Sequence, residues 1–108
     1  MKQTFLVKHA VGGRMFIDSS KQDVPYTIVP QGDGWRFTVS VRWSEKIEEL
    51  LACKDELNLF VFQEFEDQPT LKIWYYVKDG PVEYDVEQSS LTIVADSRIE
   101  YYPHQYST

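Results

Sequence analysis

The 108-residue chain has one cysteine, Cys53, and no long apolar run. A single cysteine excludes an intrachain disulfide, and a membrane-spanning helix needs about 18 or more consecutive apolar residues. The apolar run nearest the start, at residues 5–7, is also too short for the core of a secretion signal. We therefore expect a cytoplasmic protein that does not enter a membrane.

The motifs of common catalytic and metal sites are also missing. The chain has no cysteine pair at metal-binding spacing, no glycine-rich phosphate loop and no Gly-x-Ser-x-Gly turn. Its two histidines, His9 and His104, lie at opposite ends of the sequence. We therefore expect no metal, no cofactor and no enzymatic activity.

Basic residues are scarce. The chain has 11 lysines and arginines but 17 aspartates and glutamates, which gives a formal net charge of −6. The imbalance lies after residue 42, where five bases accompany fourteen acids, whereas residues 1–42 hold six bases and three acids. Nonspecific binding to nucleic acid or to an anionic membrane needs clustered lysine and arginine, so we expect neither. An acidic surface instead favours association with a basic protein.

Hydrophobic residues make up 43% of the chain and aromatic residues 15%, which is enough for a core. The length fits one domain, covering 1–108. The clearest strand is 35–43, where alternation predicts that five apolar side chains face the core. These side chains are Trp35, Phe37, Val39, Val41 and Trp43.

Turn residues divide most of the remaining chain into further strands. Gly12-Gly13 predicts a hairpin turn, and Pro25 and Pro30 confine the strand between them to a sheet edge. The other expected strands are 3–11, 14–18, 25–30, 57–65, 70–78, 82–87, 90–95 and 98–102.

Residues 44–54 are the one segment with helical periodicity. Ser44 is a good N-cap, and Ile47, Leu50 and Leu51 form one apolar stripe. Cys53 adjoins this stripe, so we expect it to be a buried, unreactive thiol.

These elements predict a mainly β (α+β) fold. We expect about eight antiparallel strands in a two-layer sandwich or a partly open barrel, with the helix as a crossover between the fourth and fifth strands. Parallel pairing of the two strands around the helix is the alternative, since a connection of a dozen residues permits it.

Apolar residues on both faces mark two of the expected strands. In 57–65, Phe60 and Phe62 alternate with aliphatic residues, which predicts a central strand covered on both sides, with the helix over one of them. In 70–78, Trp74 and Tyr76 lie opposite an aliphatic face. They either pack beneath the helix or form an interface or ligand surface, where large aromatic residues are enriched.

Three acids, Glu83, Asp85 and Glu87, alternate within the expected strand 82–87. On a strand they would share one face at intervals of about 7 Å. The simplest interpretation is an edge strand whose charges prevent edge-to-edge aggregation. The other two interpretations are a protein-binding face and a mimic of nucleic-acid phosphates.

The hypothesis for function is a non-enzymatic protein-interaction module. A small acidic domain would dock on a partner with a basic surface, and could inhibit it, through Glu83, Asp85, Glu87, Trp74 and Tyr76. One alternative is a β-barrel carrier of a small molecule, and another is a structural subunit that assembles through strand edges. A ligand-sized interior pocket would favour the carrier, whereas a filled core with an exposed aromatic patch would favour docking.

Overall fold

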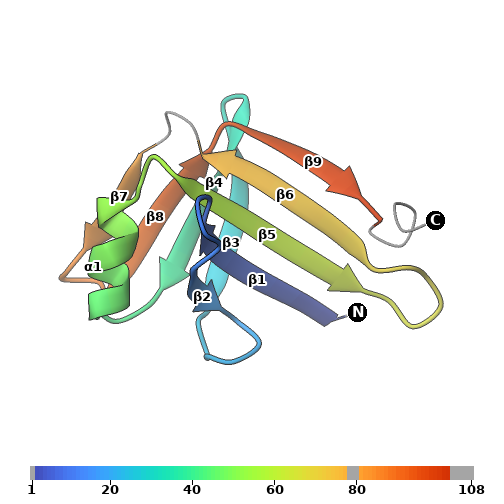
Figure 1. Ribbon diagram of the computed structural model, residues 1–108, viewed down its shortest axis with the longest axis horizontal. Helices are drawn as coiled ribbons and strands as arrows, with labels where there is room; N and C mark the ends of the chain where they lie inside the picture. The colour runs from blue at the N-terminus through green and yellow to red at the C-terminus, as the bar shows by residue number, and fades with distance from the viewer. Residues whose placement is uncertain (1, 78–80, 103–108) are drawn as a thin grey trace.

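The alternating segments of the sequence form nine antiparallel strands, and the helical segment forms one short helix, in a computed structural model that describes residues 2–77 and 81–102 (Figure 1). The fold is mainly β, as predicted. In chain order the elements are β1 (Lys2–His9), β2 (Met15–Asp18), β3 (Tyr26–Gln31), β4 (Gly34–Ser40), α1 (Glu45–Ala52), β5 (Leu57–Glu64), β6 (Leu71–Val77), β7 (Val82–Asp85), β8 (Ser90–Ala95) and β9 (Ser97–Tyr101).

The strands form two layers. One is a five-stranded sheet in the order β2-β1-β5-β6-β9, and the other is a four-stranded sheet in the order β3-β4-β8-β7. Consecutive hairpins alternate between the layers, and α1 connects β4 of one sheet to β5 of the other. Parallel pairing around the helix is therefore wrong, because these two strands belong to different sheets. The described strands form two open sheets, which makes the architecture a sandwich.

Glycine and proline act at the predicted turns and edges. Gly12 and Gly13 have φ angles of 86° and 72° and connect β1 to β2, a backbone region that residues with a Cβ avoid. Pro30 lies within β3, which is an edge strand. Gly34 has a different role, because a Cβ there would collide with the carbonyl oxygen of Ala95.

Helix α1 begins where its cap was predicted. The Ser44 hydroxyl accepts a hydrogen bond from the backbone N–H of Ile47 at 3.4 Å, and Ile47 and Leu50 are buried. Figure 1 shows α1 at one end of the sandwich, so the prediction that it covers the middle of β5 was wrong.

Cys53, the C-cap, packs against the core but remains partly exposed. The thiol was predicted to be buried, and it is only partly so. The described residues contain no helix long and apolar enough to cross a membrane.

The core lies between the sheets and is filled by aromatic and aliphatic side chains. Phe37 is fully buried, with ring centroids 5.5 Å from Phe5 and 4.8 Å from Tyr75. Of the five side chains predicted to face inward from 35–43, Phe37 and Val39 are buried, Trp35 and Val41 are partly buried, and Trp43 is 51% exposed. Trp43 departs from the prediction because β4 ends at Ser40, where the chain turns toward the helix.

Candidate functional site

The two sheets present different outer faces, where the outer face is the side turned away from the other sheet. On the four-stranded sheet, Thr27, Thr38 and Thr92 lie side by side and Glu83 continues the row. The next outward row holds Arg36 between two valines, Val29 and Val94, so this face is mostly polar and has no aromatic cluster among its described residues. Such a polar face is ordinary for a solvated sheet. The outer face of the five-stranded sheet is instead rich in large apolar side chains, so this sheet is the one whose surface needs an explanation.

Strand register gathers these side chains. Leu59 and Val61 point into the core, so Phe60 and Phe62 point outward. Pairing of β5 with β6 and of β6 with β9 sets Trp74 between Phe60 and Ile99. We call this surface the aromatic face. It comprises Phe60, Phe62, Trp74, Tyr76, Ile99 and Tyr101, with Lys8 and Lys72.

The rings of the aromatic face are in mutual contact. Trp74 has its ring centroid 5.8 Å from that of Phe60 and 4.5 Å from that of Tyr76. The ammonium group of Lys72 lies 4.8 Å from the centre of the Phe60 ring and 5.1 Å from that of Phe62. Lys8 lies 5.9 Å from the Phe60 ring. Cation–π contacts of this kind hold both lysines at the surface over the rings.

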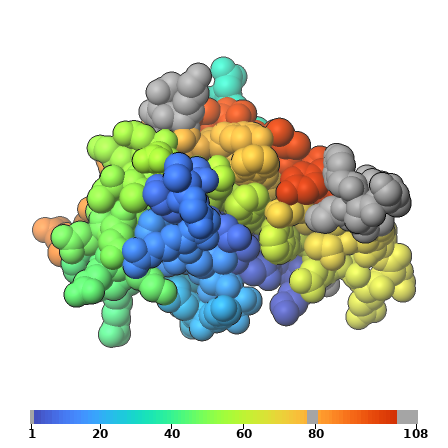
Figure 2. Space-filling model, in the orientation of Figure 1, coloured from blue at the N-terminus to red at the C-terminus, as the bar shows by residue number. Residues whose placement is uncertain are grey.

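No described element forms a third layer over this face. Figure 1 views the five-stranded sheet from outside, with the four-stranded sheet behind it. Figure 2, in the same orientation, shows atoms of β5, β6 and β9 at the surface beside the β1–β2 hairpin. The alternative in which Trp74 and Tyr76 pack beneath the helix was therefore wrong.

The indole N–H of Trp74 is buried but has no hydrogen-bond acceptor among the described residues. Buried tryptophan N–H groups usually have one. This buried donor lies in the middle of the aromatic face.

An open hollow of about 620 Å³ adjoins the aromatic face at Tyr76. Its lining is mostly apolar and includes Tyr76, Ile99 and the buried Leu57, and the acids that line it are Asp55, Glu56 and Asp96. Asp55 and Glu56 are exposed, and Glu56 lies 3.7 Å from the imidazole of His9. The aromatic face thus has lysines over its phenylalanines and acids beyond Tyr76.

The acidic residues predicted as one row do not form one. Glu83 and Asp85 lie on β7, but this strand ends at Asp85 and Glu87 lies in the following turn. The Asp85 carboxylate accepts hydrogen bonds from the backbone N–H groups of Glu87 and Gln88, at 3.0 and 3.3 Å, and so stabilises that turn. β7 is an edge strand of the four-stranded sheet. The predicted acids and the predicted aromatics therefore occupy different sheets.

Sequence reasoning found two members of the aromatic face as site residues and missed the others. Phe60 and Phe62 carried a usable signal, because they alternate with the core residues of their strand. Ile99, Asp55 and Glu56 carried none, since their proximity to Tyr76 depends on strand order and on loop positions.

The described part of the chain offers few features that point to other classes of function. It holds no group of three or more histidine, cysteine, aspartate or glutamate side chains that could bind a metal ion, and His104 lies outside it. No protein-family model, curated protein or solved structure matches this chain. Function therefore has to be inferred from the surface of the molecule itself.

Proposed function

We propose that the protein is a non-enzymatic binding domain whose aromatic face docks on a partner protein, with a basic side chain of that partner entering the hollow beside Tyr76. The observation that carries this proposal is the asymmetry between a polar outer face on one sheet and an aromatic outer face on the other. The rings of the aromatic face are each partly exposed, and Ile99 beside them is 46% exposed. Contiguous apolar surface of this kind on a soluble protein often marks a binding site.

Aromatic side chains suit the role of interface anchors. Tryptophan and tyrosine supply much of the affinity at protein interfaces, because each buries a large area for little loss of side-chain freedom. Trp74 and Tyr76 lie in contact at the centre of such a patch.

The hollow favours a lysine or arginine from the partner. Its apolar lining fits the hydrocarbon stem of such a residue, and the Tyr76 ring offers a cation–π contact. Asp55 and Glu56 would then face the cationic end. The net charge of −6 would also speed the approach of a basic partner.

Two other classes of ligand have less in their favour. Single-stranded nucleic acid binds where aromatic rings line a positively charged groove, whereas this face has two lysines on a chain of net charge −6. A carrier would hold its ligand between the sheets, where Phe5, Phe37 and Tyr75 pack against one another.

The decisive comparison uses matched variants as bait in a lysate from the source of the protein. The wild type and Thr38→Ala, on the polar outer face, should retain the same protein, whereas Trp74→Ala and Tyr76→Ala should lose it. With the purified partner, surface plasmon resonance should show at least about 30-fold weaker binding for either aromatic variant, the size expected for a central anchor. Circular dichroism checks that each variant is folded.

Charge variants test the chemistry of the partner. Asp55→Asn with Glu56→Gln should raise the dissociation rate, because these acids would lie at the contact. Replacing Glu83, Asp85 and Glu87 by serine should slow association only, since charges outside the contact act through steering over about 8 Å at physiological salt. A partner held equally well by the Trp74 and Tyr76 variants would refute the proposal.

A further inference from the structure

The two sheets of the described residues have four edge strands, and three of these strands resist pairing with another chain. β2 has four residues and an irregular register against β1, between Val7 and Lys8. β3 contains Pro30, which lacks a backbone N–H. β7 has four residues, of which Glu83 and Asp85 are acidic. Short length, irregular register, proline and charge are the usual protections of exposed edges.

β9 is the exception. It pairs regularly with β6 over five residues, from Ser97 to Tyr101, and contains neither proline nor lysine. Among the described residues no strand pairs with the other side of β9 from Ser97 to Glu100. Ile99, at its centre, is 46% exposed. An edge of this kind can accept a further antiparallel strand.

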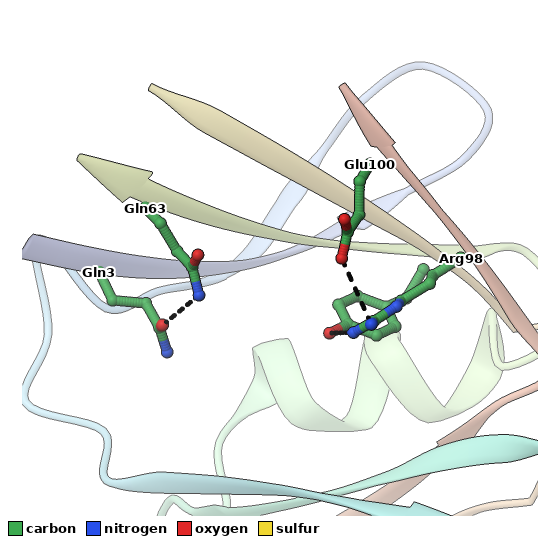
Figure 3. Close-up of polar contacts among 5 residues, drawn as sticks. Gln3, Gln63, Arg98 and Glu100 are labelled. Atoms are coloured by element: carbon green, nitrogen blue, oxygen red, sulfur yellow. Dashed lines mark hydrogen bonds and ion pairs between the residues drawn. The ribbon is translucent and has the colours of Figure 1, made fainter. Parts of the chain in front are cut away.

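The charges on β9 do not protect it against its own copy. Arg98 and Glu100 flank Ile99 and form an ion pair with an N–O distance of 3.3 Å. Figure 3 shows them on one side of the five-stranded sheet, the same side as Gln3 and Gln63. In antiparallel pairing of two β9 strands centred on Ile99, Arg98 of each copy would face Glu100 of the other. Opposite charges in facing positions stabilise a strand pair, whereas like charges destabilise it.

Arg98 is already held in place for this pairing. Its guanidinium lies 4.7 Å from the centre of the Trp35 ring and donates a hydrogen bond to the Tyr75 hydroxyl at 3.2 Å. A side chain fixed in this way loses little freedom when it gains a second carboxylate partner.

We infer that two copies of this chain join through antiparallel β9 strands centred on Ile99, and so form a two-fold symmetric dimer. The two five-stranded sheets become one continuous sheet. Ile99 lies beside Trp74 on the outer face, so the aromatic faces of the two copies become one surface. Pairing the same strand around a two-fold axis is the closed, self-complementary arrangement typical of homodimers. This dimer does not depend on the function proposed above.

Charge reversal tests the register. Sedimentation velocity over a range of concentrations should show a reversible dimer for the wild type. Arg98→Glu alone and Glu100→Arg alone should each weaken dimerisation at least tenfold, because like charges then face one another. An equimolar mixture of these two variants should recover dimers, as should the double variant Arg98→Glu/Glu100→Arg, because opposite charges face again in both.

A cysteine pair tests the centre of symmetry independently of charge. In a Cys53→Ser background, Ile99→Cys should form an intermolecular disulfide under mild oxidation, because the two positions face each other across the axis. Ser97→Cys should not, since the two Ser97 positions would lie about 13 Å apart along the strands, beyond the roughly 7 Å limit between Cα atoms for a disulfide.

Three results would overturn the inference. They are a wild type that stays monomeric at every concentration, charge variants that mixing does not rescue, and equal crosslinking at positions 97 and 99. Binding of the partner protein to a monomeric wild type would reject the dimer and leave the proposed function standing.

Discussion

The most direct test of the fold compares two aromatic residues that sequence periodicity treats alike. Phe37 is fully buried and lies in contact with Phe5 and Tyr75. Phe37→Ala removes a buried ring and leaves a cavity, which costs about 3–5 kcal/mol. For a domain of this size each kcal/mol lowers the melting temperature by about 4 °C. The expected loss is therefore about 12–20 °C.

Trp43→Ala should cost less. Trp43 is 51% exposed and has one ring contact, with a centroid distance of 5.4 Å to Tyr84. Full burial of a large apolar side chain is worth about 1.5–3 kcal/mol, and an aromatic pair adds about 0.5–1.5 kcal/mol. Half of the burial and one pair give about 1.3–3 kcal/mol. Removal from the surface leaves no enclosed cavity.

Urea unfolding followed by far-ultraviolet circular dichroism measures both variants without depending on tryptophan fluorescence. Thr38→Ala is the control, because Thr38 follows Phe37 in the chain but points to the outer face. This substitution should cost less than about 1 kcal/mol. If Trp43→Ala destabilises the protein as much as Phe37→Ala, the strand continues past Ser40 and the structure of this region is wrong.

Two further predictions concern a glycine and a carboxylate. Gly34→Ala should destabilise the protein by about 1–3 kcal/mol in urea unfolding, because the added Cβ meets the Ala95 backbone. Gly32 has open space around it but a φ of 60°. Gly32→Ala should therefore cost about 1–2 kcal/mol for backbone strain alone. The hydrogen bond from the Ser20 hydroxyl to Asp18 lowers the pKa of Asp18. Asp18 thus contributes stability above the pKa of the unfolded chain, and this is lost as pH falls through the folded value. Titration followed by NMR should show a pKa below the ordinary range, rising in Ser20→Ala; no rise would remove the assigned cause.

Local signals were enough for most of the elements. Alternation located β4, the glycine pair located the β1–β2 turn, and Ser44 marked the start of the helix. These features depend on residues close together in the sequence. The errors came where an element ends, as at Trp43 and Glu87. Alternation predicts side-chain directions only while the chain stays extended, and packing of the next element decides where it stops.

The candidate site was harder to predict because it depends on non-local pairing. Trp74 and Tyr76 could be identified as facing away from an aliphatic face, but their neighbours could not. Phe60 comes from the preceding strand of a hairpin, and Ile99 from a strand that arrives after two strands of the other sheet. Long-range strand order is set by the whole core, so no local pattern specifies which side chains meet.

The size and position of the helix separate the two interpretations of the aromatic residues. Two strands that are apolar on both faces need a third layer, and the sequence predicts a single helix. Helix α1 has eight residues, so it is about 12 Å long. The four neighbouring strands β1, β5, β6 and β9 span about 14 Å between the axes of β1 and β9. Since α1 already buries Ile47 and Leu50 at the end of the sandwich, it cannot also cover the aromatic face. The proposed docking surface rests on this apolar face, which no described element covers, whereas the proposed dimer rests separately on the edge of β9.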